Sequence, residues 1–224
     1  MNKFTVMQAF AAAFAVVALT SSAAALPLVK DGKACCSIVL SRDKLSEGDA
    51  FAAIELATYL EKASGARPEI GFAAKPGLYP IYIEGRFNSR LPRPAAAKFS
   101  EVKDDGYLIC VTPEAAHVAS RAQVGVIYGA YEILKRAAGI RWFYPGEDGE
   151  YVPKGRDLAL EEALLVDNPA MLRRSFNFVC ANVGTTQAAE LWGLRNKMSV
   201  GWRFGGLRHG GGHVFSTLLP DTYF

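Results

Sequence analysis

Two histidines lie four residues apart in the run His209-Gly-Gly-Gly-His213. Histidines at this spacing can share one metal ion when a helix places both on one face, but three glycines disfavour a helix and no third ligand is evident. The sequence therefore predicts no metal site. The run is also reminiscent of loops that supply oxyanion-hole amides in esterases, but the chain has no Gly-x-Ser-x-Gly elbow. It also has no Walker loop and no dinucleotide-type Gly-x-Gly-x-x-Gly, so no cofactor is expected.

Arg173 and Arg174 begin a strand-like run that extends to residue 179. A planar guanidinium is suited to sugar hydroxyls or to the carboxylate of a uronate, so Arg174 is a candidate for substrate binding. The alternative is that one of the two arginines only anchors the seam between two parts of the chain. Neighbours on a strand point to opposite faces, so only one of them can face such a site.

Aromatic residues are the other candidates for contact with a ligand. Trp142, Phe143 and Tyr144 could stack on a sugar ring, although aromatic residues in a short strand more often pack in a core or a domain interface. Trp192 and Asn196 lie four apart in an expected helix and so share a face, for which packing against a barrel is the expected role.

Four cysteines, Cys35, Cys36, Cys110 and Cys180, allow three full disulfide pairings. A ring between the adjacent Cys35 and Cys36 would be strained, which makes Cys110 a better partner for one of them. Free, buried thiols are the equally weighted alternative. The lone His117, in a strand-like segment, has no predicted role.

The 224 residues are 50% hydrophobic and 21% charged, a composition typical of a folded protein of one or two domains. The formal net charge of +3 is spread along the chain without a basic block, so no nucleic-acid partner is expected. A complete (β/α)8 barrel needs about 250 residues, more than the chain contains.

Residues 1–25 are typical of a bacterial signal peptide. Lys3 supplies the positive start, the apolar run extends over residues 10–19, and Ala23-Ala24-Ala25 fits a cleavage site. The run is shorter than the roughly 20 residues of a membrane span. We therefore expect a periplasmic or secreted protein with no membrane partner after cleavage.

The elements expected after residue 27 alternate between strands and helices. A Ser-Glu-Gly-Asp capping sequence at residues 46–49 starts a helix over 47–64, and apolar periodicity predicts a second helix over 123–138. Gly125 and Gly129 in that helix indicate close approach to a sheet. Strands are expected at 36–40, 80–84, 106–112, 140–144 and 150–152, and a loop at 86–100.

Residues 27–165 should thus form one two-layer α/β domain, with a mixed sheet and two main helices. Asn168-Pro169 marks a seam, after which a strand at 173–179, a helix at 187–198 and a glycine-rich stretch at 201–212 are expected.

Three segments carry a resemblance to a known family: residues 53–65, Tyr128–Leu134 and Gly139–Gly146 followed by Val152-Pro153. Together they resemble the N-terminal accessory domain of family 67 α-glucuronidases, a module that also precedes the barrel in β-hexosaminidases. The segments 169–174, 191–196 and 212–220 resemble the opening of a (β/α)8 barrel in a secreted, largely uncharacterised bacterial group of glycosidases.

The resemblance implies a glycoside hydrolase that acts on polysaccharide fragments, with a carbohydrate partner that could contain uronate. It implies that His213 lines the substrate pocket. Glycosidic cleavage needs two facing carboxylates, but Glu190 and Asp221, the acidic residues after the seam, match no catalytic position. No catalytic residue is therefore assigned, and 169–224 is expected to be a truncated barrel start. The alternative function is a stand-alone carbohydrate-binding or interaction module.

Overall fold

A computed structural model describes residues 25–85, 90–103, 105–171, 174 and 183–199. Several predictions fall outside the described residues: the signal peptide up to residue 24, most of the strand at 173–179, the glycine-rich stretch, and the side chains of His213 and Cys180. Among the described residues, no helix is both long and apolar enough to cross a membrane, and no group of three metal-binding side chains occurs.

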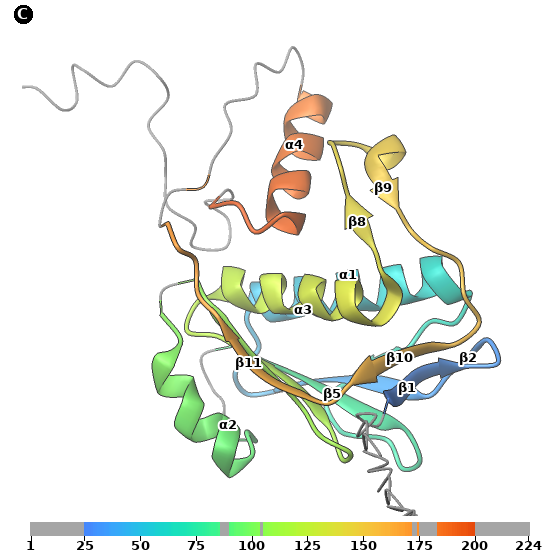
Figure 1. The fold of residues 1–224 in the computed structure, drawn as a ribbon, viewed down its shortest axis with the longest axis vertical. Coiled ribbons are helices and arrows are strands. Elements are labelled where there is room, and N and C mark those ends of the chain that lie inside the picture. The colour runs from blue at the N-terminus through green and yellow to red at the C-terminus, as the bar shows by residue number, and fades with distance from the viewer. Residues whose placement is uncertain (1–24, 86–89, 104, 172–173, 175–182, 200–224) are drawn as a thin grey trace, which may run out of the picture.

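A six-stranded mixed sheet forms the base of the fold, in the order β11-β6-β7-β5-β3-β4 (Figure 1). Strands β7, β5, β3 and β4 run parallel to one another, whereas β6 and β11 are antiparallel additions at one side. The strands are Cys36–Leu40 (β3), Glu69–Gly71 (β4), Tyr79–Glu84 (β5), Tyr107–Val111 (β6), Ala116–Ala119 (β7) and Ala163–Asp167 (β11). The predicted mixed sheet is confirmed.

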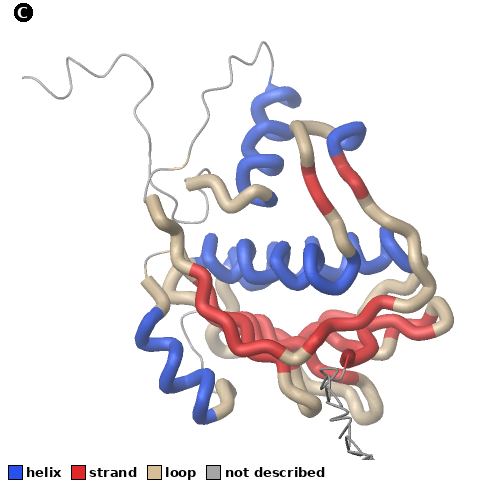
Figure 2. The backbone as a smooth tube through the Cα atoms, in the orientation of Figure 1, coloured by secondary structure: helices blue, strands red, loops and turns tan. Residues whose placement is uncertain are grey.

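Helices α1, Glu47–Ser64, and α3, Gln123–Ala138, lie side by side over one face of this sheet (Figure 2). Their bounds match the prediction. Ser46 and Asp49 form the expected capping box, and Gly65 ends α1 in the left-handed conformation. Both ends of α1 are therefore fixed by residues within one turn of them.

The glycines of α3 do allow a close approach to the sheet. A Cβ atom at Gly129 would lie 2.4 Å from Val118 Cγ1, and one at Gly125 would lie 2.1 Å from Ser120 Oγ. Side chains there would push α3 away from β7, so the loss of helix propensity is offset by packing.

The opposite face of the sheet carries a short helix that the sequence did not predict. Helix α2, Arg93–Lys98, lies within the expected loop and continues into a 3-10 turn at Phe99–Glu101. The prolines that favoured a loop occupy the start of α2, where a missing N–H costs nothing. Ala95 of this helix packs on Leu108 and Cys110 of β6.

A small sheet, a hairpin and a helix complete the described fold. Strands Ala25–Lys30 (β1), Lys33–Ala34 (β2) and Leu158–Glu161 (β10) form a small sheet that shares the core under α1 and α3. Strands Arg141–Trp142 (β8) and Glu150–Tyr151 (β9) form a hairpin, and helix Val183–Arg195 (α4) lies beside it (Figure 1). After Asn168, α4 is the one element in the described part of the chain, and no closed barrel is seen.

The three described cysteines are free thiols. Cys36 faces α1 and α3, whereas Cys110 faces α2 on the other side of the sheet. Strands β5 and β7 also separate them, a distance of about 14 Å at the usual strand spacing. A disulfide needs Cα atoms within about 7 Å. The expected pairing with Cys110 is therefore wrong, and the alternative of free buried thiols is confirmed for Cys36 and Cys110.

Candidate functional site

Arg174, the described member of the predicted substrate-binding pair, lies where the C-terminal segment meets the α/β domain. Its Nη2 atom is 2.5 Å from Asp105 Oδ2, its Nε donates to the carbonyl of Lys197 and its Nη1 donates to the carbonyl of Met171. These contacts match the alternative given in the sequence analysis, in which one arginine anchors the seam between two parts of the chain. A substrate-binding role for Arg174 stays a prediction, and His213 lies outside the described residues.

A cavity of about 320 Å³ opens beside Arg174. It is lined by Asp105, Tyr107, Tyr128, Asp167, Asn168, Pro169, Ala170, Arg174, Asn196 and Lys197. The lining thus comes from the ends of β6 and β11, from α3 and from the residues that follow α4. Such a junction between two parts of a chain is a common place for a binding site.

Lys197 is the centre of the polar lining. Its ammonium lies 2.8 Å from Glu132 Oε2 and 2.9 Å from Asp167 Oδ2, and it also donates to the hydroxyl of Tyr107. Burial alone would raise the pKa of the Asp167 carboxyl, but hydrogen bonds from Tyr107 and Lys197 outweigh it and hold that pKa below its usual value. Asp167 is therefore ionised at neutral pH.

The backbone of Lys197 is left-handed, with φ of 57°. This conformation follows a helix end, where glycine is the usual residue, and costs a residue with a Cβ roughly 1–2 kcal/mol. The ion pairs of Lys197 offset that cost. The strained backbone places the ammonium between two carboxylates of the α/β domain.

Arg195, in the last turn of α4, forms a second ionic contact. Its Nη1 lies 2.8 Å from Glu150 Oε1 and its Nη2 lies 3.3 Å from Glu55 Oε2, and all three side chains are at most 14% exposed. The guanidinium also lies over the rings of Tyr59 and Trp142, 5.1 and 5.9 Å from their centroids.

Glu55 and Glu150, the two carboxylates that pair with Arg195, also bind other side chains. Burial would raise the pKa of the Glu150 carboxyl, but hydrogen bonds from Lys62 and Tyr59 and the charge of Arg195 outweigh it and lower that pKa. Tyr131 donates to Glu55 Oε2 at 2.8 Å. Both carboxylates thus also accept a hydrogen bond from a tyrosine of the α/β domain.

Trp192 and Asn196 share a face of the chain at α4, as expected, but they contact the hairpin rather than a barrel. Trp192 Nε1 donates to the carbonyl of Trp142 at 3.1 Å, and Asn196 Nδ2 donates to the same oxygen at 3.0 Å. Trp142 itself is buried between Tyr59 and Tyr131, with edge-to-face rings. The packing role weighed for Trp142, Phe143 and Tyr144 is therefore confirmed for Trp142 alone, because Phe143 and Tyr144 are 66% and 53% exposed.

We call Arg174, Arg195 and Lys197 the C-terminal clamp. These three cations bind five carboxylates of the α/β domain: Asp105, Glu55, Glu150, Glu132 and Asp167. Sequence reasoning did not find Arg195, Lys197 or their partners. The partners lie 30 to 140 positions away along the chain, so no local spacing could have indicated them.

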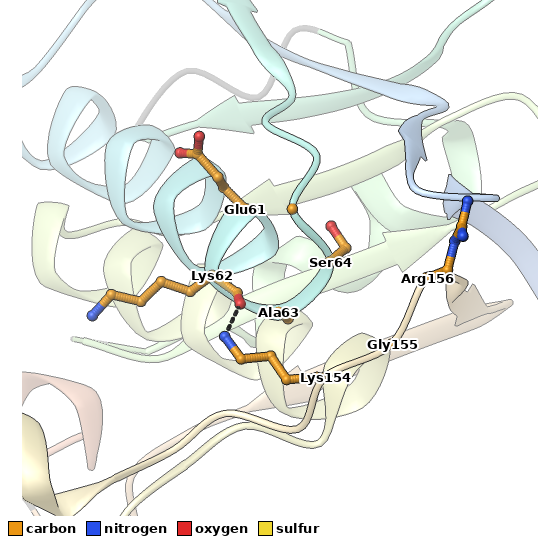
Figure 3. A pocket seen from close by; sticks show the side chains of 8 residues that line it. Glu61, Lys62, Ala63, Ser64, Lys154, Gly155 and Arg156 are labelled. Carbon is orange, nitrogen blue, oxygen red and sulfur yellow. Dashed lines mark hydrogen bonds between the residues drawn. The ribbon is translucent and has the colours of Figure 1, made fainter.

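A second, wider hollow of about 640 Å³ lies at the C-terminal end of α1 (Figure 3). Lys154 points to this helix end and donates to the carbonyl of Lys62, while the side chains of Lys62, Glu61 and Arg156 point away from it. Cations at a helix C-terminus stabilise its free carbonyls. Lys62 is paired with Glu150 at 2.8 Å. The cations of this hollow therefore serve contacts within the protein.

No protein-family model and no curated protein matches the chain. Among solved structures, it is similar to the GH20 β-N-acetylhexosaminidase from Streptomyces coelicolor A3(2), with 15% identity, a TM-score of 0.44 and coverage of 66% of this chain and 24% of that one. A GH20 exo β-N-acetylglucosaminidase from Vibrio harveyi has 10% identity and a TM-score of 0.42, with coverage of 68% of this chain and 18% of that one. The Flavobacterium johnsoniae chitobiase has 13% identity and a TM-score of 0.41, with coverage of 67% of this chain and 19% of that one. The chain spans about a quarter or less of the length of these structures.

Proposed function

We propose that the chain is the non-catalytic portion of an exported carbohydrate-active protein, in which the α/β domain holds the C-terminal segment in a fixed position. The observation that carries this proposal is the C-terminal clamp. Three cations that follow the seam each bind buried or half-buried carboxylates before it. A flexible linker would need no such contacts, so the geometry favours a rigid mount.

The carbohydrate part of the proposal is supported by the sequence resemblance. The segments that resemble the α-glucuronidase accessory domain include Tyr131 and Trp142, and the structure places both beneath α4. Specificity for α-glucuronides is part of the proposal and rests on that resemblance alone.

Export is supported by the order of features at the start of the chain. The apolar run and the small residues precede Ala25, and the first strand, β1, begins at that residue. Cleavage after Ala25 would leave the described sheet almost complete.

The test is to express the full chain with its leader in a bacterial host, to weigh the exported species and to measure binding and hydrolysis of hexasaccharides of glucose, N-acetylglucosamine and galacturonic acid. We expect loss of about 25 residues, binding of at least one glycan and no release of reducing sugar. Retention of the leader in the cytoplasm would contradict export. Hydrolysis by the purified chain would contradict a non-catalytic role, and binding of no glycan would contradict the carbohydrate assignment.

A further inference from the structure

The β8–β9 hairpin has one buried face and one aromatic, exposed face. Trp142 and Glu150 are cross-strand partners and point inward, toward α1 and α4. Phe143, Tyr144 and Tyr151 are 66%, 53% and 55% exposed. The rings of Phe143 and Tyr151 are neighbours, with centroids 6.4 Å apart and planes tilted by 48°. Three exposed aromatic rings on one short hairpin require an explanation.

The inward face of the hairpin holds its outward face rigid. Trp142 is wedged between two tyrosines, and Glu150 is paired with Arg195 and Lys62, each at 2.8 Å. At the turn, a Cβ on Gly149 would lie 2.0 Å from the carbonyl oxygen of Tyr144, so only glycine fits this tight bend. Binding of a ligand to the outward face would thus cost little free energy for ordering the backbone.

We propose that the neighbouring rings of Phe143 and Tyr151 form a binding platform for one or two sugar residues of an oligosaccharide. The inference rests on the proposed carbohydrate function and assigns it a place that the C-terminal clamp does not occupy. The negative face of an aromatic ring attracts the C–H groups on one face of a pyranose.

The size of the platform fits a small ligand better than a protein. With about 150–250 Å² for each aromatic side chain, the exposed fractions of Phe143 and Tyr151 amount to roughly 240 Å². A stable protein–protein interface needs about 800 Å² from each partner. One or two sugar rings can cover the platform, whereas a second copy of the chain would need more surface around it.

Charged groups around the two rings can bind sugar hydroxyl groups. Glu147 and Asp148 in the hairpin turn are exposed, and their carboxylates can accept hydrogen bonds from hydroxyl groups. The exposed Arg141 is the cross-strand partner of Tyr151, so it lies on the same face as that ring. One of its Nη atoms donates to the carbonyl of Ile140 at 2.7 Å, and its other N–H groups can donate to hydroxyl oxygens.

The test measures binding of cellohexaose, chitohexaose and hexagalacturonic acid to the full chain by calorimetry. The variant Phe143→Ala/Tyr151→Ala removes the two neighbouring rings, and Phe143→Tyr/Tyr151→Phe keeps them. The control is Phe72→Ala, which removes an exposed ring, 44% exposed, that follows β4. We expect at least one of the three hexasaccharides to bind the unmodified chain. The double alanine variant should weaken this binding about tenfold or more, while the other two variants change it less than about twofold.

Unchanged binding in Phe143→Ala/Tyr151→Ala would overturn the platform and leave the proposed function standing. Binding of none of the three probes by the unmodified chain would overturn both. Loss of a concentration-dependent dimer in the double alanine variant would show a self-association surface instead. If the double variant does not fold, Tyr151→Ala gives the same test with a single exposed side chain.

Discussion

Replacing Arg195 with methionine should release α4 from the α/β domain. Methionine keeps much of the apolar stem of the arginine but removes its charge from between Glu55 and Glu150, which are 14% and 9% exposed. Removing one partner of a buried ion pair typically costs about 3–5 kcal/mol, because the other charge is left buried. Lys62 still pairs with Glu150, so we expect the lower end of this range, about 3 kcal/mol.

The assay is hydrogen exchange of the backbone amides, read by mass spectrometry of peptides from the native chain. A cost of about 3 kcal/mol corresponds to opening that is about 100-fold more frequent. We expect this acceleration in α4, while amides at the centres of α1 and α3 keep their protection. The control is Arg136→Met, which removes an exposed arginine that pairs with Glu132 at 3.1 Å. Such pairs are worth at most about 1 kcal/mol.

The result that refutes the clamp is α4 exchange no faster in Arg195→Met than in Arg136→Met. A second check removes the charges that the first variant leaves buried. In the Arg195→Met background, Glu55→Gln and Glu150→Gln should restore part of the lost protection, because neutral amides need no cation. If the glutamine changes do not slow the exchange of α4 relative to Arg195→Met alone, the loss of protection in Arg195→Met comes from packing rather than from charge.

Three other predictions concern the core of the α/β domain. Burial, and then the charge of Arg90, lower the pKa of His117 from 6.5 to about 4. Since the unfolded chain then binds the proton more readily, stability falls as pH drops below 6.5, by about 2 kcal/mol between pH 7 and pH 5. Urea unfolding should show this loss in the wild-type chain and not in His117→Phe. Burial raises the pKa of Glu84 against the opposing charge of Arg90. Glu84→Gln should therefore unfold at higher urea than wild type at pH 7, with the gain vanishing in acid, where the wild-type carboxyl is protonated too; a gain that persists at low pH would contradict this reading. Gly129→Ala should lower the unfolding free energy by about 1–3 kcal/mol, because its Cβ would clash with Val118, and a neutral effect in thermal unfolding would show that α3 can shift freely.

The elements that the sequence predicted best are those whose signals are local. The bounds of α1 follow from its capping box and from Gly65, and the end of α3 follows from Gly139. A cap or a left-handed stop acts within one turn, so a window of a few residues contains its whole cause. Helix α2 was missed because Pro92 and Pro94 are compatible with both a loop and a first helical turn.

Only some of the strands were predicted. Strands β3, β5 and β6 of the main sheet were expected, but β4 and β11 were missed, and the neighbours and faces of the strands were not predicted. Alternation in the sequence indicates that β3 and β6 are strands, yet it does not say that β5 and β7 lie between them. For that reason, sequence reasoning allowed a disulfide between Cys36 and Cys110, which the structure places on opposite faces. Strand order depends on which segments pair across the whole domain, and each pairing leaves no local signature.

The sequence by itself therefore determined the two main helices, the existence of several strands, the close approach at Gly129 and the buried role of Trp142. Only the tertiary structure decided the C-terminal clamp and the exposed aromatic face of the hairpin. Arg195 and Glu55 are 140 positions apart, and whether an aromatic residue is covered depends on which segments fold over it. A one-dimensional pattern records what a residue prefers, whereas the partner that satisfies it is chosen when the layers pack together.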